Sequence, residues 1–127
     1  MKRKDLVKKA DRLFSKYIRD KYAINGAASC ITCGKVEPVS EMDAGHFIDR
    51  RWLGTRWHEK NVYPQCRHCN RFLDGNIDKF KEKLLYLHGE GILEELEEEK
   101  KKDVDINAAI EYIINCAGVS GRSTRKW

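Results

Sequence analysis

The chain has 127 residues, which fits one domain with a modest hydrophobic core. Lysine and arginine together number 25 against 20 aspartates and glutamates, for a net charge of +5. No apolar run is long enough to span a membrane, and no signal-peptide pattern follows the N-terminal methionine. These features argue against a membrane protein and a secreted protein. We therefore expect a cytoplasmic protein with no membrane partner and with reduced thiols.

The positive charge is concentrated at the N-terminus. Residues 1–25 carry nine Lys/Arg and three Asp, whereas residues 90–105 carry eight Asp/Glu and three Lys. Apolar residues recur at helical spacing over residues 3–23, which predicts an amphipathic helix in this basic segment. The opposite face carries a basic stripe for which we expect DNA contacts: Lys4, Lys8, Arg12, Lys16 and Arg19. A solvated helix face without a partner is the alternative for this stripe.

Four of the five cysteines form two Cys-x-x-Cys pairs, Cys30 with Cys33 and Cys66 with Cys69. Two short turns of this kind predict four thiolates around one structural zinc ion per chain. Two disulfides are the alternative, which a reducing cytoplasm disfavours. The fifth cysteine, Cys116, lies in an apolar segment and is expected to be a small buried residue.

Between and beyond the cysteine pairs we expect two antiparallel strands and a short helix. The strands are predicted at residues 42–48 and 62–65, and the helix at residues 67–73. The loop between the strands carries three arginines for which we expect DNA contacts: Arg50, Arg51 and Arg56. Residues 28–76 thus form a predicted unit of strand, loop, strand and helix.

The C-terminal part is predicted to be helical over residues 77–118, with three apolar stripes. Asp105 is expected to cap the last helix and Gly118 to end it. A basic tail follows over residues 119–127. Together these predictions give a single α+β domain over residues 1–127 with N-terminal and C-terminal helical extensions.

The central unit resembles a known family. The matching features are the two cysteine pairs, Ala-Gly-His-Phe at 44–47, Asn61, Gln-Cys-x-x-Cys-Asn at 65–70 and Gly75-Asn76. They are similar to the NinG (Rap) recombination nucleases of lambdoid phages. More broadly, they resemble the HNH or His-Me finger superfamily with a zinc-stapled ββα-metal core, as in phage endonuclease VII. The match covers about residues 30–76, and the segment 80–89 with the acidic helix after it also looks like NinG.

The resemblance implies a metal-dependent DNA endonuclease that acts on branched DNA or Holliday junctions in phage recombination. A phage-encoded protein of this kind would work in the host-cell cytoplasm. Because a four-way junction presents two related strands, a homodimer is also expected. The apolar stripes at residues 6–18 and 106–117 could form its interface, although packing onto the chain's own core is the simpler alternative. The rival functions are a non-catalytic zinc-binding DNA adaptor and a general HNH nicking or restriction-type nuclease.

Phosphodiester hydrolysis gives the polar residues of this unit separate roles. Neutral histidine can accept a proton from water near pH 7, so His46 is the expected general base. Mg²⁺ or Mn²⁺, one per chain, prefers oxygen ligands, and the amide oxygen of Asn70 can provide one. The resemblance places a metal-binding asparagine at Asn70. It also implies that Asn61 belongs with His46 to the catalytic residues, where it braces the loop of His46 without touching the metal.

One position departs from the superfamily pattern. Many members place a metal-binding carboxylate or histidine directly before the catalytic histidine, whereas this chain has Gly45 there. Asp43 is the nearest upstream acid, and alternate residues of a strand share a face. We therefore expect Asp43 to complete the catalytic metal site, with Asp49 and Asp74 as the other acids within reach.

Overall fold

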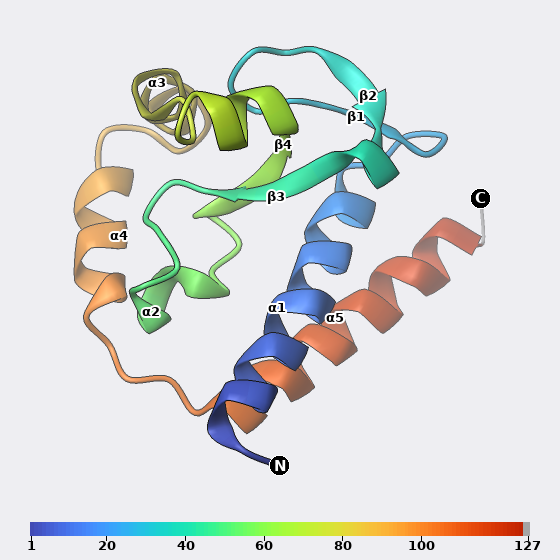
Figure 1. Ribbon diagram of the computed structural model, residues 1–127, viewed down its shortest axis with the longest axis vertical. Coiled ribbons are helices and arrows are strands. Elements are labelled where there is room, and N and C mark those ends of the chain that lie inside the picture. The colour runs from blue at the N-terminus through green and yellow to red at the C-terminus, as the bar shows by residue number, and fades with distance from the viewer. Residues whose placement is uncertain (126–127) are drawn as a thin grey trace.

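The computed structural model describes the backbone of residues 1–125 and the side chains of residues 1–118. A two-stranded antiparallel hairpin crosses its centre, formed by β3 (Met42–His46) and β4 (Val62–Cys66) (Figure 1). Both strands predicted from the sequence are confirmed, although β3 ends two residues earlier than expected and β4 one residue later. Helices cover the hairpin on both sides, which gives the mixed α and β architecture that the sequence predicts.

One side of the hairpin is covered by two long helices, α1 (Arg3–Lys21) and α5 (Ile106–Arg125) (Figure 1). Phe14 and Ile18 of α1 join Ile113 of α5 in one buried cluster. This cluster also holds Val62 and Trp57, so the helices are joined to the hairpin. The apolar stripes at 6–18 and 106–117 therefore pack within the chain, and the idea that they form an exposed dimer surface is wrong.

The last helix is longer than the sequence suggested. Asp105 caps it as expected, because its Oδ1 accepts a hydrogen bond of 3.2 Å from the backbone N–H of Ala108. The backbone of α5 continues to Arg125, so the predicted end at Gly118 is wrong. One glycine costs a helix about 1 kcal/mol and does not by itself end it. The side chains of residues 119–127, predicted as a basic tail, lie outside the described part.

The other side of the hairpin is covered by α3 (Ile77–His88) and α4 (Ile92–Lys100). A second buried cluster joins these helices to β4 through Tyr63, Phe80 and Leu96. The short helix α2 (Leu53–Arg56) lies against the end of α4, where a side chain on Gly54 would meet the carbonyl oxygen of Glu99 at 1.8 Å. Only glycine permits this close approach between the two backbones.

The four paired cysteines are framed by short elements: β1 (Ala27–Ser29), β2 (Val36–Pro38), the 3₁₀ turn η1 (Val39–Glu41) and the π-helical turn η2 (His68–Phe72). The hairpin of β1 and β2 was not predicted, because three-residue strands show no alternation. The expected helix near 67–73 is present as η2. No helix in the described residues is long and apolar enough to cross a membrane.

Candidate functional site

Four cysteine sulfurs converge between β1, β4 and η2. The Sγ atoms of Cys30, Cys33, Cys66 and Cys69 all lie within 4.8 Å of one another. The sulfurs of Cys33 and Cys66 are 3.8 Å apart, which is about the sulfur–sulfur edge of a tetrahedron with Zn–S bonds of roughly 2.3 Å. All four thiols are free, so the alternative of two disulfides is wrong. The cluster has the ligand set of a closed structural zinc site.

Neighbouring groups donate hydrogen bonds to these sulfurs. The backbone N–H of Cys69 lies 3.4 Å from Sγ of Cys66, and Nδ2 of Asn76 lies 3.6 Å from Sγ of Cys69. Burial raises the pKa of Cys30, but hydrogen bonds from Thr32 and from backbone groups outweigh it and lower that pKa to about 6. Burial instead raises the pKa of Cys33 and raises the pKa of Cys66 to about 12. The Cys30 thiolate is therefore favoured at neutral pH before a metal binds, whereas the other thiols would lose their protons on binding zinc.

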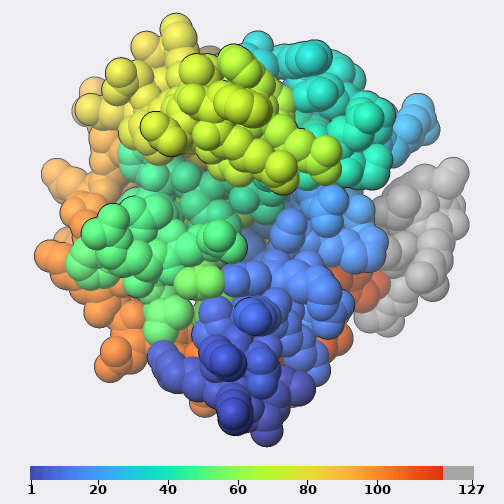
Figure 2. All heavy atoms as spheres, viewed as in Figure 1, coloured from blue at the N-terminus to red at the C-terminus, as the bar shows by residue number. Residues whose placement is uncertain are grey.

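A cleft of about 880 Å³ opens beside the cysteine cluster. Its walls come from α1, from β3 and the loop after it, from η2 and from the start of α3. Figure 2 shows the surface hollowed between α1 and the segment that carries η2. The predicted base His46 and the predicted metal ligands Asp43 and Asn70 all line this cleft.

His46 stands at the end of β3 in an orientation fixed by one hydrogen bond. Its Nε2 lies 2.9 Å from the backbone carbonyl oxygen of Arg56. Because a carbonyl can only accept, the proton of the neutral ring is on Nε2 and the lone pair is on Nδ1. Burial is the main cause that holds the pKa of His46 below its ordinary value of 6.5, so the ring is neutral at cellular pH. A neutral histidine with a fixed tautomer is what a general base requires.

The carbonyl that orients His46 is itself held in place by α1. Asp11 accepts two hydrogen bonds from the guanidinium of Arg56, at 2.9 Å and 2.6 Å, and a third from Nε1 of Trp57 at 3.0 Å. Burial acts to raise the pKa of Asp11, but these hydrogen bonds outweigh it and keep that pKa low. The N-terminal helix therefore supports the candidate base through Arg56.

Asn61 closes the loop that follows His46. Its Oδ1 accepts from the N–H of Ile48 at 2.8 Å, and its Nδ2 donates to the carbonyls of Ile48 and Thr55 at 3.0 Å each. The side chain is fully buried and does not line the cleft. These are the bracing hydrogen bonds expected for Asn61, whereas its part in catalysis stays a prediction.

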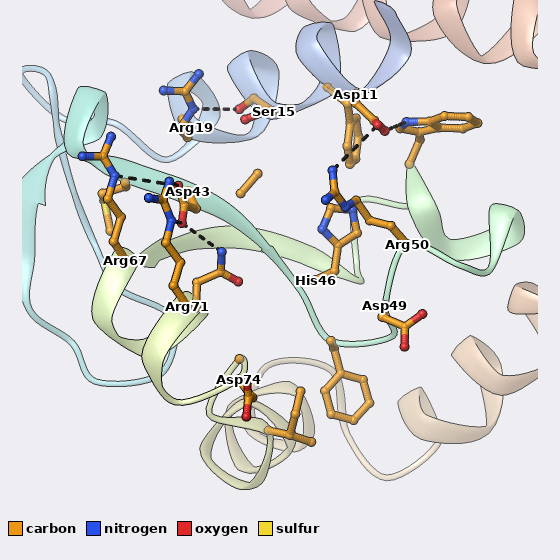
Figure 3. A pocket seen from close by; sticks show the side chains of 18 residues that line it. Asp11, Ser15, Arg19, Asp43, His46, Asp49, Arg50, Arg67, Arg71 and Asp74 are labelled. Atoms are coloured by element: carbon orange, nitrogen blue, oxygen red, sulfur yellow. Dashed lines mark hydrogen bonds and ion pairs between the residues drawn. The ribbon is translucent and has the colours of Figure 1, made fainter. Parts of the chain in front are cut away.

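Asp43 lies across the cleft from His46 (Figure 3), and it contacts Asn70 there. Nδ2 of Asn70 lies 2.9 Å from Oδ2 of Asp43, and Arg71 donates to both carboxylate oxygens at 2.9 Å each. A nitrogen of Arg67 lies 3.9 Å from the same carboxylate. Burial acts to raise the pKa of Asp43, but hydrogen bonds from Arg71 and Asn70 outweigh it, so the carboxylate is ionised at neutral pH.

The two other acids near the cleft are placed differently. Asp49 is exposed and accepts three hydrogen bonds from Arg51, two residues along the chain. Asp74 lies apart from Asp43 and His46 in Figure 3. Of the three acids that the sequence offered, Asp43 is the one whose carboxylate contacts Asn70.

Gly45 has a packing reason to be glycine. A Cβ atom at this position would lie 2.1 Å from Oε1 and 2.8 Å from Cβ of Gln65. Gln65 is fully buried and donates from Nε2 to Oγ1 of Thr32 at 3.1 Å and to the carbonyl of Gly75 at 2.8 Å. Gln65 therefore takes the space that a metal-binding side chain at position 45 would need.

The basic residues predicted to contact DNA differ in their exposure and position. Lys4 and Lys8 line a shallow depression of about 540 Å³ that shares Asp11 with the cleft. Arg12, Lys16, Arg50 and Arg51 are exposed, and Arg19 is half-buried at the cleft wall. Arg56 differs from the others, because its guanidinium is mostly buried against Asp11.

Four residues that shape this site were not assigned from the sequence: Asp11, Gln65, Arg67 and Arg71. Arg67 and Arg71 stand four residues apart and frame the last zinc cysteine, a spacing that could have shown that they share one face. Asp11 is an acid within a basic helix, which hints at a buried partner. Nothing local in the sequence identifies Arg56 as that partner, 45 residues away.

A family model described as "Bacteriophage Lambda NinG protein" matches residues 1–120 of the chain. The chain belongs to the NinG family. It is 27% identical over 92 residues to protein ninG of Escherichia phage lambda, which covers 72% of this chain and 43% of that protein. It is also 27% identical over 97 residues to protein ninG of Salmonella phage P22, which covers 76% of this chain and 46% of that protein. No solved structure matches the chain.

The chain therefore spans less than half the length of these two NinG relatives. The family match includes α1, the cysteine cluster and every residue of the cleft.

Proposed function

We propose that this NinG-family protein is a metal-dependent DNA endonuclease of the HNH or His-Me finger type with an endonuclease VII-like core. Its reaction is hydrolysis of a phosphodiester bond, and its substrates are branched DNA molecules such as Holliday junctions. The observation that carries this proposal is the single cleft that holds a tautomer-fixed histidine together with a carboxylate–amide pair. The order of strand, loop, strand and short helix around a four-cysteine cluster agrees with a ββα-metal core.

The carboxylate–amide pair fits a hard divalent cation. Carboxylate and amide oxygens are the ligand types that Mg²⁺ and Mn²⁺ prefer. The side chains of Asp43 and Asn70 already touch through a hydrogen bond of 2.9 Å, and Arg71, which donates to both carboxylate oxygens, would have to release Asp43 for an ion to bind. The amide of Asn70 can present its oxygen by rotation of about 180°, since oxygen and nitrogen occupy equivalent places in the group. Asp43 and Asn70 would therefore hold one Mg²⁺ or Mn²⁺, with water and phosphate as its other ligands.

The bound cation would stabilise the negative charge that develops on phosphate during cleavage. His46 would take the proton of the attacking water on Nδ1, the nitrogen that the carbonyl of Arg56 leaves free. Asn61 and Asp11 would hold the base in position, through the loop after β3 and through Arg56 respectively. Arg67 and Arg71 bring positive charge to the wall where the phosphate would lie.

Phosphate contacts are assigned to seven basic residues, of which Arg19 and Arg50 line the cleft and the others lie outside it: Lys4, Lys8, Arg12, Lys16, Arg19, Arg50 and Arg51. We assign Arg56 instead to the support of His46, because its guanidinium is held by Asp11. An HNH core is not expected to supply a recognition helix for the major groove, so selectivity would depend on DNA shape, which is easier to distort at a branch. The homodimer remains part of the proposal, with an interface other than the two buried apolar stripes.

The test is nicking of supercoiled plasmid and of a four-way junction in Mg²⁺ or Mn²⁺. His46→Ala should lower the cleavage rate by about 10²- to 10⁴-fold, the usual contribution of a general base. DNA affinity and the folded state should be retained, because only one ring at the edge of the cleft is removed. His58→Ala is the matched control, since His58 does not line the cleft.

Three outcomes would overturn parts of this proposal. Near wild-type cleavage by His46→Ala would remove His46 as the base. DNA binding without any cleavage by the wild-type protein would instead support the non-catalytic adaptor. Equal cleavage of linear and branched DNA by a monomer would support a general HNH nuclease.

A further inference from the structure

An exposed apolar surface adjoins the candidate cleft. Phe72 is the last residue of η2, and 77% of its surface is exposed. Leu73 follows it at 46% exposure, and Ile77 at the start of α3 is 41% exposed. We call these three residues the apolar ledge. Ile77 also lines the cleft, so the ledge continues from the wall that carries Asn70.

The ring of Phe72 has an aromatic neighbour on one side only, among the described residues. His68 stacks on one side of it, with ring centroids 5.9 Å apart and planes inclined by 27°. The turn beneath is tied to the cysteine cluster, because the N–H of Gly75 donates to the carbonyl of Cys69 at 2.9 Å. The N–H of Leu73 donates in turn to the carbonyl of His68 at 3.1 Å. An aromatic ring that is fixed from behind and open in front is suited to stacking rather than to packing in a core.

The charge around the ledge indicates what would cover it. Arg67 and Arg71 stand on the same segment, with about half of each side chain exposed. An exposed aromatic ring beside arginines is the combination that binds single-stranded nucleic acid, since the arginines contact phosphate and the ring stacks on a base. A paired base inside a duplex has both of its faces covered, whereas a base at a branch point has one face free.

We propose that the apolar ledge, and Phe72 above all, stacks on an unpaired or unstacked nucleobase at a DNA branch point. This role rests on the proposed action on branched DNA. It would explain structurally why the protein prefers branched DNA to linear duplex. The base would lie on the open face of the Phe72 ring, opposite His68. The adjoining phosphate would reach the cleft wall that holds Asp43 and Asn70.

Binding without cleavage tests this role separately from the nuclease activity. The probes are a four-way junction with 2-aminopurine at the branch point and a linear duplex of the same sequence, without added divalent metal. The wild-type protein should bind the junction more tightly and quench the 2-aminopurine fluorescence. Phe72→Ala should weaken junction binding by about 5- to 150-fold, the usual effect of losing one base–aromatic stack, and should abolish the quenching.

Several controls make the result specific. Duplex affinity of Phe72→Ala should stay within about twofold of wild type, and Phe72→Trp should keep the junction preference. Tyr86→Ala removes an aromatic ring that is 83% exposed on α3 and does not line the cleft, and it should change neither affinity. Because Phe72 is exposed, the Phe72→Ala variant should have the same zinc content and the same unfolding midpoint as the wild-type protein.

Two results would overturn the stacking role. One is an unchanged junction affinity for Phe72→Ala, or an equal loss on junction and duplex. The other is a loss that follows dissociation of a dimer in sedimentation, which would make the ledge a contact between copies of the chain. A wild-type protein that shows the expected binding pattern but never cuts DNA would contradict only the nuclease proposal.

Discussion

Replacing Asp11 with asparagine tests whether α1 supports the candidate base. The carboxylate and the Arg56 guanidinium form two hydrogen bonds, and their side chains are only 22% and 18% exposed. Removing one partner of a fully buried pair costs about 3–5 kcal/mol, whereas an exposed pair contributes about 0–1 kcal/mol. With about a fifth of each side chain exposed, we expect Asp11→Asn to lower the free energy of unfolding by about 2–3 kcal/mol.

The effect should appear in both stability and catalysis. For a chain of this size the expected loss corresponds to a decrease in Tm of about 6–15 °C. Because the carbonyl of Arg56 orients His46, kcat for nicking should decrease by about 10- to 100-fold at a temperature where the variant is folded. Thermal unfolding followed by circular dichroism and plasmid nicking measure the two effects.

Asp20→Asn on the same helix is the matched control. Asp20 pairs with Lys16 at 2.8 Å, but these side chains are 54% and 71% exposed, so its loss should cost less than about 0.5 kcal/mol. A double-mutant cycle with Arg56→Gln should give a coupling energy above about 1 kcal/mol. Additive effects of the two substitutions, or an Asp11→Asn variant as stable and active as wild type, would refute the supporting role of α1.

Three further outcomes are expected. Removal of zinc by a chelator should unfold residues 27–76, because zinc binding contributes about 10–16 kcal/mol of folding free energy in zinc-finger peptides. Elemental analysis that finds less than about half a zinc per folded chain would contradict this prediction. The acid limb of kcat/KM should lie below pH 6.5, since burial lowers the pKa of His46 and keeps its lone pair available in that range. Folding stability should likewise decrease as the pH falls below 6.5, because the unfolded chain then binds the proton that folded His46 excludes; an acid limb above pH 7 would point to another base. Gly45→Ala should cost about 1–3 kcal/mol in urea unfolding, because its Cβ would overlap Gln65. Gly91→Ala is the control: the added Cβ would have no atom within 4 Å, so the free energy of unfolding should stay unchanged.

The helices were the most predictable part of the fold. Each of the long ones buries one apolar stripe, and that stripe is visible as a period in the sequence. The left-handed residues Asp74, Gly75 and Asn76 also end the turn after the last cysteine, as a run of turn-forming residues predicts. The hairpin of β1 and β2 could not be recognised, because its strands are too short to show alternation.

The site was predictable only where the residues are close in sequence or share a motif. His46, Asn61 and Asn70 follow from the motif, and the cysteines from their spacing. Asp11 does not, because its pairing with Arg56 depends on how α1 packs against the hairpin. The steric conflict at Gly45 depends in the same way on the register that places Gln65 across from β3.

The position of α1 limits how this protein can be divided. A basic amphipathic helix at one end of a chain could be read as a detachable DNA-binding arm, joined to an independent catalytic unit. Here its inner face forms one wall of the cleft and shields Val62 of the central hairpin from water. A fragment that begins at Ala27 would keep every motif residue, yet it would lose the α1 wall of the cleft and expose Val62. The smallest autonomous unit is therefore set by the helices around the motif rather than by the motif.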